Sequence, residues 1–183
     1  MRRLFIPVLL ALLAVGVISA LVWAQAGAQA PKPADPWSRL NFLVGEWRGV
    51  GTGAPGEAEG GTSFALNLDK KILVRNNWAK YPPKPGEKSG LSHEDLMIIY
   101  PAGDDPTLRA MYFDNEGHVI PYSLSFSQKP GAVAFETDSA QPGPRFRMTY
   151  ELKEDGTLAN VFWIAPPGGE FKVYVQGALK KVK

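Results

Sequence analysis

Apolar residues recur at every second position in three separate stretches, and this alternation limits most of the chain to a β architecture. The stretches lie at 118–126, 145–152 and 171–179, with polar or small residues in between. Between 171 and 179 the expected inner face holds Phe171, Val173, Val175 and Leu179. A hydrophobic repeat of two residues predicts strands with one buried face and one solvent-exposed face, as in antiparallel sheets.

Turn residues interrupt the chain about every dozen positions, which predicts ten strands joined by hairpins. The expected strands lie near 46–53, 58–68, 71–80, 93–100, 107–114, 118–127, 131–138, 144–153, 157–165 and 171–181. Ten strands exceed what a strongly twisted flat sheet usually holds, so we expect an antiparallel up-and-down barrel. Pro36 precedes a short apolar segment at 37–44, which predicts a helical turn at one end of the barrel.

Composition excludes several classes of function. The chain has 183 residues with a net charge of +2 and no cysteine. Without cysteine there is no disulfide, thiolate metal site or cysteine nucleophile. The slight charge forms no basic patch, so nucleic acid is not an expected partner.

The N-terminus has the order of charges and apolar residues typical of a secretory signal. Arg2 and Arg3 precede an uncharged apolar run at 4–23, and Ala-Gln-Ala follows at 24–26 and 28–30. We expect a signal peptide at 1–30, a linker at 31–36 and a barrel domain at 37–183, located in the periplasm or outside the cell. The alternative is that the leader is retained as an uncleaved membrane anchor. If the leader is removed, we expect no membrane insertion by the mature domain.

No catalytic constellation or metal site is expected from the titratable residues. Glu94 and Asp95 are neighbours in a strand and should point to opposite faces. His118 follows a tight turn and is either a polar group or ligand inside a cavity, or a strand-edge residue bonded to the backbone. His93 is expected at a solvated strand start.

Aromatic residues on nearly every strand leave two interpretations open, a packed core or a cavity. Barrel diameter grows with strand number, and an aromatic cavity with a few polar groups suits a small apolar or amphipathic ligand. The expected cavity residues are Trp47, Trp78, Tyr112, His118, Tyr122, Phe126 and Tyr150.

The segment Leu40-Asn41-Phe42-Leu43-Val44-Gly45-Glu46-Trp47-Arg48-Gly49 resembles the opening of calycin-like (lipocalin-like) barrels, where a helical turn leads into a glycine-x-tryptophan. It is similar to a bacterial family of exported proteins of unknown function and, more distantly, to the haem-binding nitrobindin barrels. That second resemblance implies a haem-ligating histidine near the end of the barrel. The corresponding stretch 171–177 has none, so haem is disfavoured and we expect no cofactor.

Three functions remain open from the sequence. The first is an extracytoplasmic module that binds a small apolar or amphipathic ligand in the barrel. The second is a small-molecule enzyme of the isomerase or hydrolase type that uses His118 in the cavity. The third is a structural or interaction protein of the cell envelope, with a packed core and an exposed apolar patch.

Overall fold

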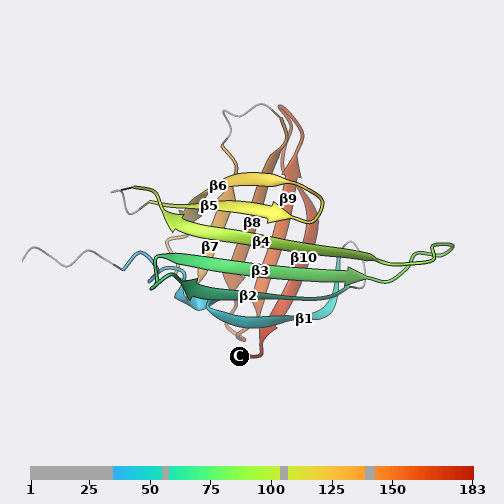
Figure 1. Ribbon diagram of the computed structural model, residues 1–183, viewed down its shortest axis with the longest axis horizontal. Coiled ribbons are helices and arrows are strands. Elements are labelled where there is room, and N and C mark those ends of the chain that lie inside the picture. Colours follow the sequence, from blue (N-terminus) through green and yellow to red (C-terminus); the bar gives the residue numbers. More distant parts are fainter. Residues whose placement is uncertain (1–34, 55–57, 104–106, 139–142) are drawn as a thin grey trace, which may run out of the picture. The chain divides into compact units, whose positions relative to one another are not determined.

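The computed structural model describes residues 35–183 except 55–57, 104–106 and 139–142, so the expected signal peptide lies outside the described residues. The described chain forms ten antiparallel strands that close into a barrel, with a single 3-10 turn, η1 (Asn41–Leu43) (Figure 1). The strands are β1 (Gly45–Ala54), β2 (Glu59–Asn67), β3 (Ile72–Tyr81), β4 (Leu91–Pro101), β5 (Leu108–Asp114), β6 (Val119–Phe126), β7 (Ala132–Glu136), β8 (Arg145–Leu152), β9 (Leu158–Ala165) and β10 (Lys172–Lys181). The all-β barrel expected from the alternation is confirmed.

Closure depends on pairing between the first and last strands. Each strand pairs with its neighbours in sequence, and β1 pairs with β10 from Trp47↔Lys181 to Ala54↔Gln176. Beyond the ladder, the Glu46 amide donates to the Lys183 carbonyl at 2.9 Å. Because the ring of strands is closed, the sheet has no unpaired edge in the described part of the chain.

The expected single apolar face at 171–179 is wrong in part, because β10 contains an irregularity. Its register on β9 shifts between Val173 and Val175, so Val173 pairs with Trp163 whereas Val175 pairs with Phe162. A bulge reverses the side to which later residues point. Val173 is therefore on the outer face and 43% exposed, while Val175 and Leu179 remain on the inner one.

The N-terminal segment closes one end of the barrel. Trp37, Leu40 and Leu43 belong to the buried core. The Trp37 indole N–H donates to the carbonyl of Lys70 in the β2–β3 hairpin at 2.7 Å. Arg39 reaches across to the Ser127 carbonyl after β6, also at 2.7 Å. The opposite end, where the β3–β4 hairpin projects, carries no such segment among the described residues (Figure 1).

Aromatic rings cross the middle of the barrel in an unbroken series of edge-to-face contacts. The series runs from Tyr112 through Tyr122, Phe135 and Tyr150 to Phe64, with centroid separations of 6.4, 6.4, 6.3 and 5.4 Å. Such contacts add to the stabilisation that burial of the rings provides. We call these five rings the aromatic belt.

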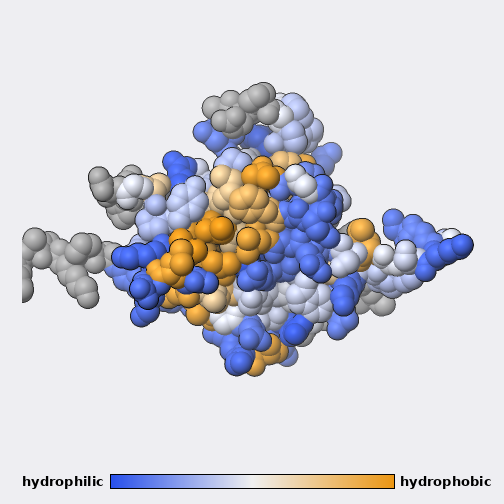
Figure 2. Space-filling view, viewed as in Figure 1, coloured by the Kyte–Doolittle hydropathy of each residue, from blue (hydrophilic) through white to orange (hydrophobic). Residues whose placement is uncertain are grey.

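The outer face of the barrel is part polar and part apolar. Figure 2 shows apolar side chains gathered over the middle strands of the front sheet. On the outer face of β5 and β6, the paired residues Phe113 and Val119 are 37% and 59% exposed. Hydrophilic side chains surround this area and cover the β3–β4 hairpin. Within the described residues, no helix is long and apolar enough to span a bilayer.

Truncation of the closing segment tests its contribution to stability. Leu40 has no exposed surface, so Leu40→Ala should lower the free energy of unfolding by about 2–5 kcal/mol through lost burial and a residual cavity. Leu91→Ala is the control, because Leu91 is 61% exposed, and its effect should stay within about 0.5 kcal/mol. Urea denaturation measures both, and equal effects would show that the segment does not close the core.

Candidate functional site

A buried ion pair lies inside the barrel on two adjacent strands. Arg75 on β3 and Asp95 on β4 are 3% and 8% exposed, and the guanidinium donates to the Asp95 carboxylate. The Asn77 amide donates to the second carboxylate oxygen at 2.8 Å. Burial alone lowers the pKa of Arg75, but the Asp95 charge together with Tyr150 and Tyr112 outweighs it, so the pKa of Arg75 is raised and the residue stays cationic.

His93 links this pair to the open end of the barrel. Its Nε2 lies 3.3 Å from the Asp95 carboxylate and 3.2 Å from the Tyr112 hydroxyl, and its Nδ1 lies 2.9 Å from the Glu116 carboxylate. The hydrogen bond to Asp95 raises the pKa of His93 to about 9; burial opposes the shift, and the bond to Glu116 reinforces it. His93 is therefore an imidazolium at neutral pH.

A second carboxylate, that of Asp114, connects Tyr112 to His118 at the rim of the open end. Asp114 accepts hydrogen bonds from the Tyr112 hydroxyl at 3.2 Å and from the His118 backbone amide at 2.9 Å, and the His118 ring Nδ1 lies 2.8 Å away. Burial raises the pKa of Asp114, but the hydrogen bonds from His118 outweigh it and the pKa is lowered. The carboxylates and imidazoles therefore form one connected network from the interior to the rim.

The tyrosines of the belt remain neutral phenols. Burial raises the pKa of Tyr150 to about 12, and burial likewise raises the pKa of Tyr112 and Tyr122 well above their usual value. Their hydroxyl groups keep their protons at physiological pH: Tyr112 donates to Asp114 and Tyr150 to the Met148 sulfur, while the Tyr122 hydroxyl has no partner among the described residues. The interior thus offers a cationic guanidinium, a cationic imidazole and neutral phenols.

The wall opposite the network is aromatic and partly open. In a ring of ten strands β9 lies across from β4, and the Phe162 ring on β9 stacks on Phe146 of β8 at 6.0 Å. Tyr174, 60% exposed, packs edge to face on the same Phe162. Gly177, on the inner face by register, is exposed, and a Cβ there would meet no atom within 4 Å. A side chain at position 177 would therefore meet no neighbour among the described residues.

Two buried polar atoms of the interior have no partner among the described residues, the Nε of Arg75 and the hydroxyl of Tyr122. A buried donor without an acceptor costs roughly 1–3 kcal/mol, and native proteins satisfy nearly all such groups. Both atoms belong to the layer where the polar network meets the aromatic belt. A water or a ligand acceptor at that layer would satisfy them.

The structure brings together part of the predicted cavity set. Tyr112, Tyr122 and Tyr150 share the interior. Trp47 is buried in the core, where its indole donates to the Leu43 carbonyl at 2.8 Å, and the Phe126 ring packs under Arg39 at the closed end.

Two predicted cavity residues lie elsewhere. The pairing Trp78↔Glu94 places Trp78 on the outer face, because the neighbouring Asn77 and Asp95 point inward. Alternation along a strand allows no other arrangement here. The ring of His118 is 57% exposed at the rim and is fixed by Asp114, so it lies outside the enclosed interior.

Sequence reasoning missed Arg75, Asp95 and the inner position of His93. A signal was present: Arg75 stands two positions from Leu73, and Asp95 two positions from Met97, on the faces that alternation assigns to the core. Opposite charges at inward positions of consecutive strands indicate a buried pair. Asp95 does point away from its neighbour Glu94, as the spacing predicted.

Comparisons with known proteins support the fold alone. No protein-family model matches the chain, and no curated protein matches it. A solved structure described as the crystal structure of Rv2717c from M. tuberculosis is similar, with a TM-score of 0.57 over 84% of this chain and 99% of that one. The sequence identity is 14%, so the likeness is one of β-barrel architecture.

The charge on His93 makes stability depend on pH. Its pKa is raised from 6.5 to about 9 on folding, so the stabilisation is complete below pH 6.5 and is lost as pH rises through 9. The melting temperature of the wild type should therefore fall between pH 6.5 and pH 9 by more than that of His93→Gln. Calorimetry across this range measures the difference. If the melting temperatures of the wild type and His93→Gln changed equally with pH, the charged state of His93 would be contradicted.

Proposed function

We propose that the protein is an exported, calycin-like binding module that holds a small apolar or amphipathic molecule in the open half of its barrel. The observation that carries this proposal is the pair of unpartnered buried atoms, Arg75 Nε and the Tyr122 hydroxyl, inside a barrel whose opposite wall is aromatic. Pockets that bind small molecules combine apolar walls with a few placed polar groups.

The polar atoms indicate the chemistry of such a ligand. Both unpartnered groups can donate a hydrogen bond, so they favour an acceptor such as a carbonyl or carboxylate oxygen on the ligand. The stacked Phe146 and Phe162 rings suit an apolar body. A molecule with an apolar body and one buried acceptor therefore fits best.

A second candidate is a small-molecule enzyme, and one contact favours it. The His118 Nδ1 lies 2.8 Å from the Asp114 carboxylate, the geometry of a histidine oriented by an acid. The ring is mostly exposed at the rim, however, and the more buried His93 is cationic at neutral pH and cannot accept a proton. Binding without covalent chemistry is therefore the stronger proposal.

Ligand capture tests the binding proposal. The purified protein is incubated with a lipid extract and with defined saturated fatty acids, and bound mass is read by native mass spectrometry. We expect one bound molecule per chain, and Tyr122→Phe should weaken binding about two- to tenfold through the lost hydrogen bond.

The matched control is Val173→Ala, which changes the outer face and should leave binding unchanged. Removing an unpartnered hydroxyl should also leave Tyr122→Phe at least as stable as the wild type without ligand. The absence of bound mass from both the lipid extract and the defined fatty acids would contradict the proposal.

Haem does not fit the donors that the interior provides. Iron needs an axial ligand held by the fold. Both His93 nitrogens are engaged by carboxylates, the His118 ring is held at the rim, and the buried Met148 sulfur accepts from the Tyr150 hydroxyl at 3.7 Å. The resemblance to nitrobindin barrels implies haem binding, but the segment 171–177 lacks the ligating histidine. His93, His118 and Met148 are not placed to replace it.

Titration with ferric haem tests this disagreement directly. We expect no saturable one-to-one change at the Soret band, and the same spectrum for wild type and His118→Ala. A sharp stoichiometric shift that His118→Ala abolishes would reverse this expectation and place His118 at the centre of the site.

A further inference from the structure

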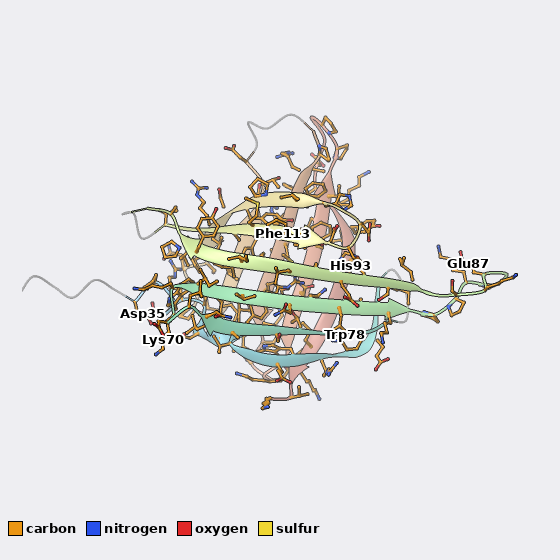
Figure 3. All side chains as sticks on the ribbon, viewed as in Figure 1. Asp35, Lys70, Trp78, Glu87, His93 and Phe113 are labelled. Atoms are coloured by element: carbon orange, nitrogen blue, oxygen red, sulfur yellow. The ribbon has the colours of Figure 1, made fainter. Side chains whose placement is uncertain are left out.

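Apolar side chains form a block on the outside of the barrel, over four adjacent strands, β3 to β6. Figure 1 shows these strands side by side, and Figure 3 labels Phe113 near the middle of them. On β4 the outward residues alternate with the buried Asp95 and Met97. The register places the block in two neighbouring rows, Val74–Ile98–Met111 and Leu96–Phe113–Val119, which we call the outer apolar face. A contiguous apolar area rimmed by polar residues is typical of a contact surface.

A cation and an anion stand at opposite ends of the outer apolar face. Arg109 on β5 lies one row beyond Met111, and Glu94 on β4 lies one row beyond Leu96. Both side chains are exposed. Arg109 donates to the Ser123 hydroxyl, and neither Arg109 nor Glu94 takes part in an ion pair among the described residues. Each is therefore available to an opposite charge on a partner.

A hollow of about 660 Å³ beside Glu94 gives a partner's side chain room to enter. Asp95 and Asp114 also line it, but their carboxylates are held by internal pairs, so Glu94 is the lining carboxylate that such a side chain can reach. Lys80, a further lining residue, lies over the Trp78 ring at 5.7 Å and forms no ion pair with Glu94. The hollow thus borders the outer apolar face at its acidic end.

The outer apolar face is self-complementary under a two-fold axis that lies between two facing copies and runs across the strands. When this axis lies between the two rows, Ile98 faces Leu96 of the second copy, and Met111 faces Phe113 of the second copy. Apolar residues then meet apolar residues on both sides of the axis. In such a symmetric interface one patch on each copy suffices.

The charged ends fix the direction of this axis. Arg109 and Glu94 lie on adjacent strands and six residues apart along them, which corresponds to about 4.8 Å by about 20 Å. Setting each over the other in the second copy makes the strands of the two copies cross at about 27°, within the about 30° that packed sheets allow. An axis parallel to the strands would place Arg109 over Tyr100 and leave both charges unpaired.

The size and charge of the surface favour a second copy over a membrane. Four rows on four strands cover about 500 Å² of sheet on each copy, so a dimer would bury about 1,000 Å², the lower limit for specific association. An anionic membrane attracts clustered cations, whereas here Arg109 is matched by Glu94. The surface therefore suits a weak, symmetric contact between proteins.

From this arrangement we infer that a second copy of this chain packs on the outer apolar face. The two copies form a symmetric dimer in which Arg109 of each pairs with Glu94 of the other, in the hollow between β3 and β5. This inference goes beyond the interior binding proposed above and does not depend on it.

Sedimentation velocity of the full-length protein, from about 1 to about 200 μM, tests the inference. We expect a reversible dimer with a micromolar dissociation constant, because the interface is small. Arg109→Glu and Glu94→Arg should each weaken the dimer about tenfold or more, since each substitution places like charges at both symmetric contacts.

Charge exchange distinguishes this geometry from general association. A 1:1 mixture of the Arg109→Glu and Glu94→Arg proteins should form a heterodimer with nearly wild-type affinity, because opposite charges then face each other at both contacts. The double variant should recover the homodimer for the same reason. The mixture keeps the test decisive if the double variant does not fold.

A matched pair of valines controls for the apolar contact. Val119→Asp introduces a charge into the outer apolar face, whereas Val173→Asp does so on β10, and the two valines are 59% and 43% exposed. We expect Val119→Asp to be monomeric and Val173→Asp to dimerise like the wild type. Circular dichroism checks that both variants keep the barrel.

Three results would overturn the inference. The first is a wild type that stays monomeric at about 200 μM. The second is an association that both single charge variants and Val119→Asp leave unchanged, as self-association through the apolar residues 4–23 would be. The third is a monomer that binds phosphatidylethanolamine–phosphatidylglycerol vesicles and loses this binding in Val119→Asp, which would assign the face to a membrane.

Discussion

A guanidinium inside a closed barrel has to be compensated where it stands, because Arg75 is only 3% exposed and its charge is withdrawn from water. Asp95 supplies the opposite charge from the adjacent strand, and the carboxylate then needs further donors, which Asn77 and His93 provide. Removing one partner of such a pair leaves a buried charge uncompensated and costs several kcal/mol, about 3–5 in measured cases. The rest of the interior network follows from this single requirement.

The network also determines how the two ends of the barrel differ. From His93 the hydrogen bonds continue to Tyr112 and Glu116, and Tyr112 leads to Asp114 and the rim. At the other end the interior is filled by Leu40 and Leu43 from the N-terminal segment, which carry no polar side-chain atoms. The aromatic belt lies between these halves, so its tyrosine hydroxyls can meet the polar side while its rings pack with the core.

The strands were predictable because alternation and turn residues are local signals, and each expected strand lies within about two residues of the observed one. The bulge in β10 was not predictable, because the shift of its register on β9 between Val173 and Val175 leaves no mark in the composition of the strand. The site was predictable only in part. Tyr112, Tyr122 and Tyr150 follow from alternation, but placing His93 required the register of β4 on β3, and single-sequence patterns do not supply register.

Unpartnered groups connect stability with binding in this fold. Arg75 Nε and the Tyr122 hydroxyl lower the stability of an empty barrel, because each is withdrawn from water without a replacement among the described residues. Any molecule that supplies an acceptor to them binds the folded chain and not the unfolded one, and so stabilises the fold by mass action. At a given free ligand concentration the gain in stability depends on the dissociation constant alone, because the relief of these two unpartnered groups is already contained in the affinity.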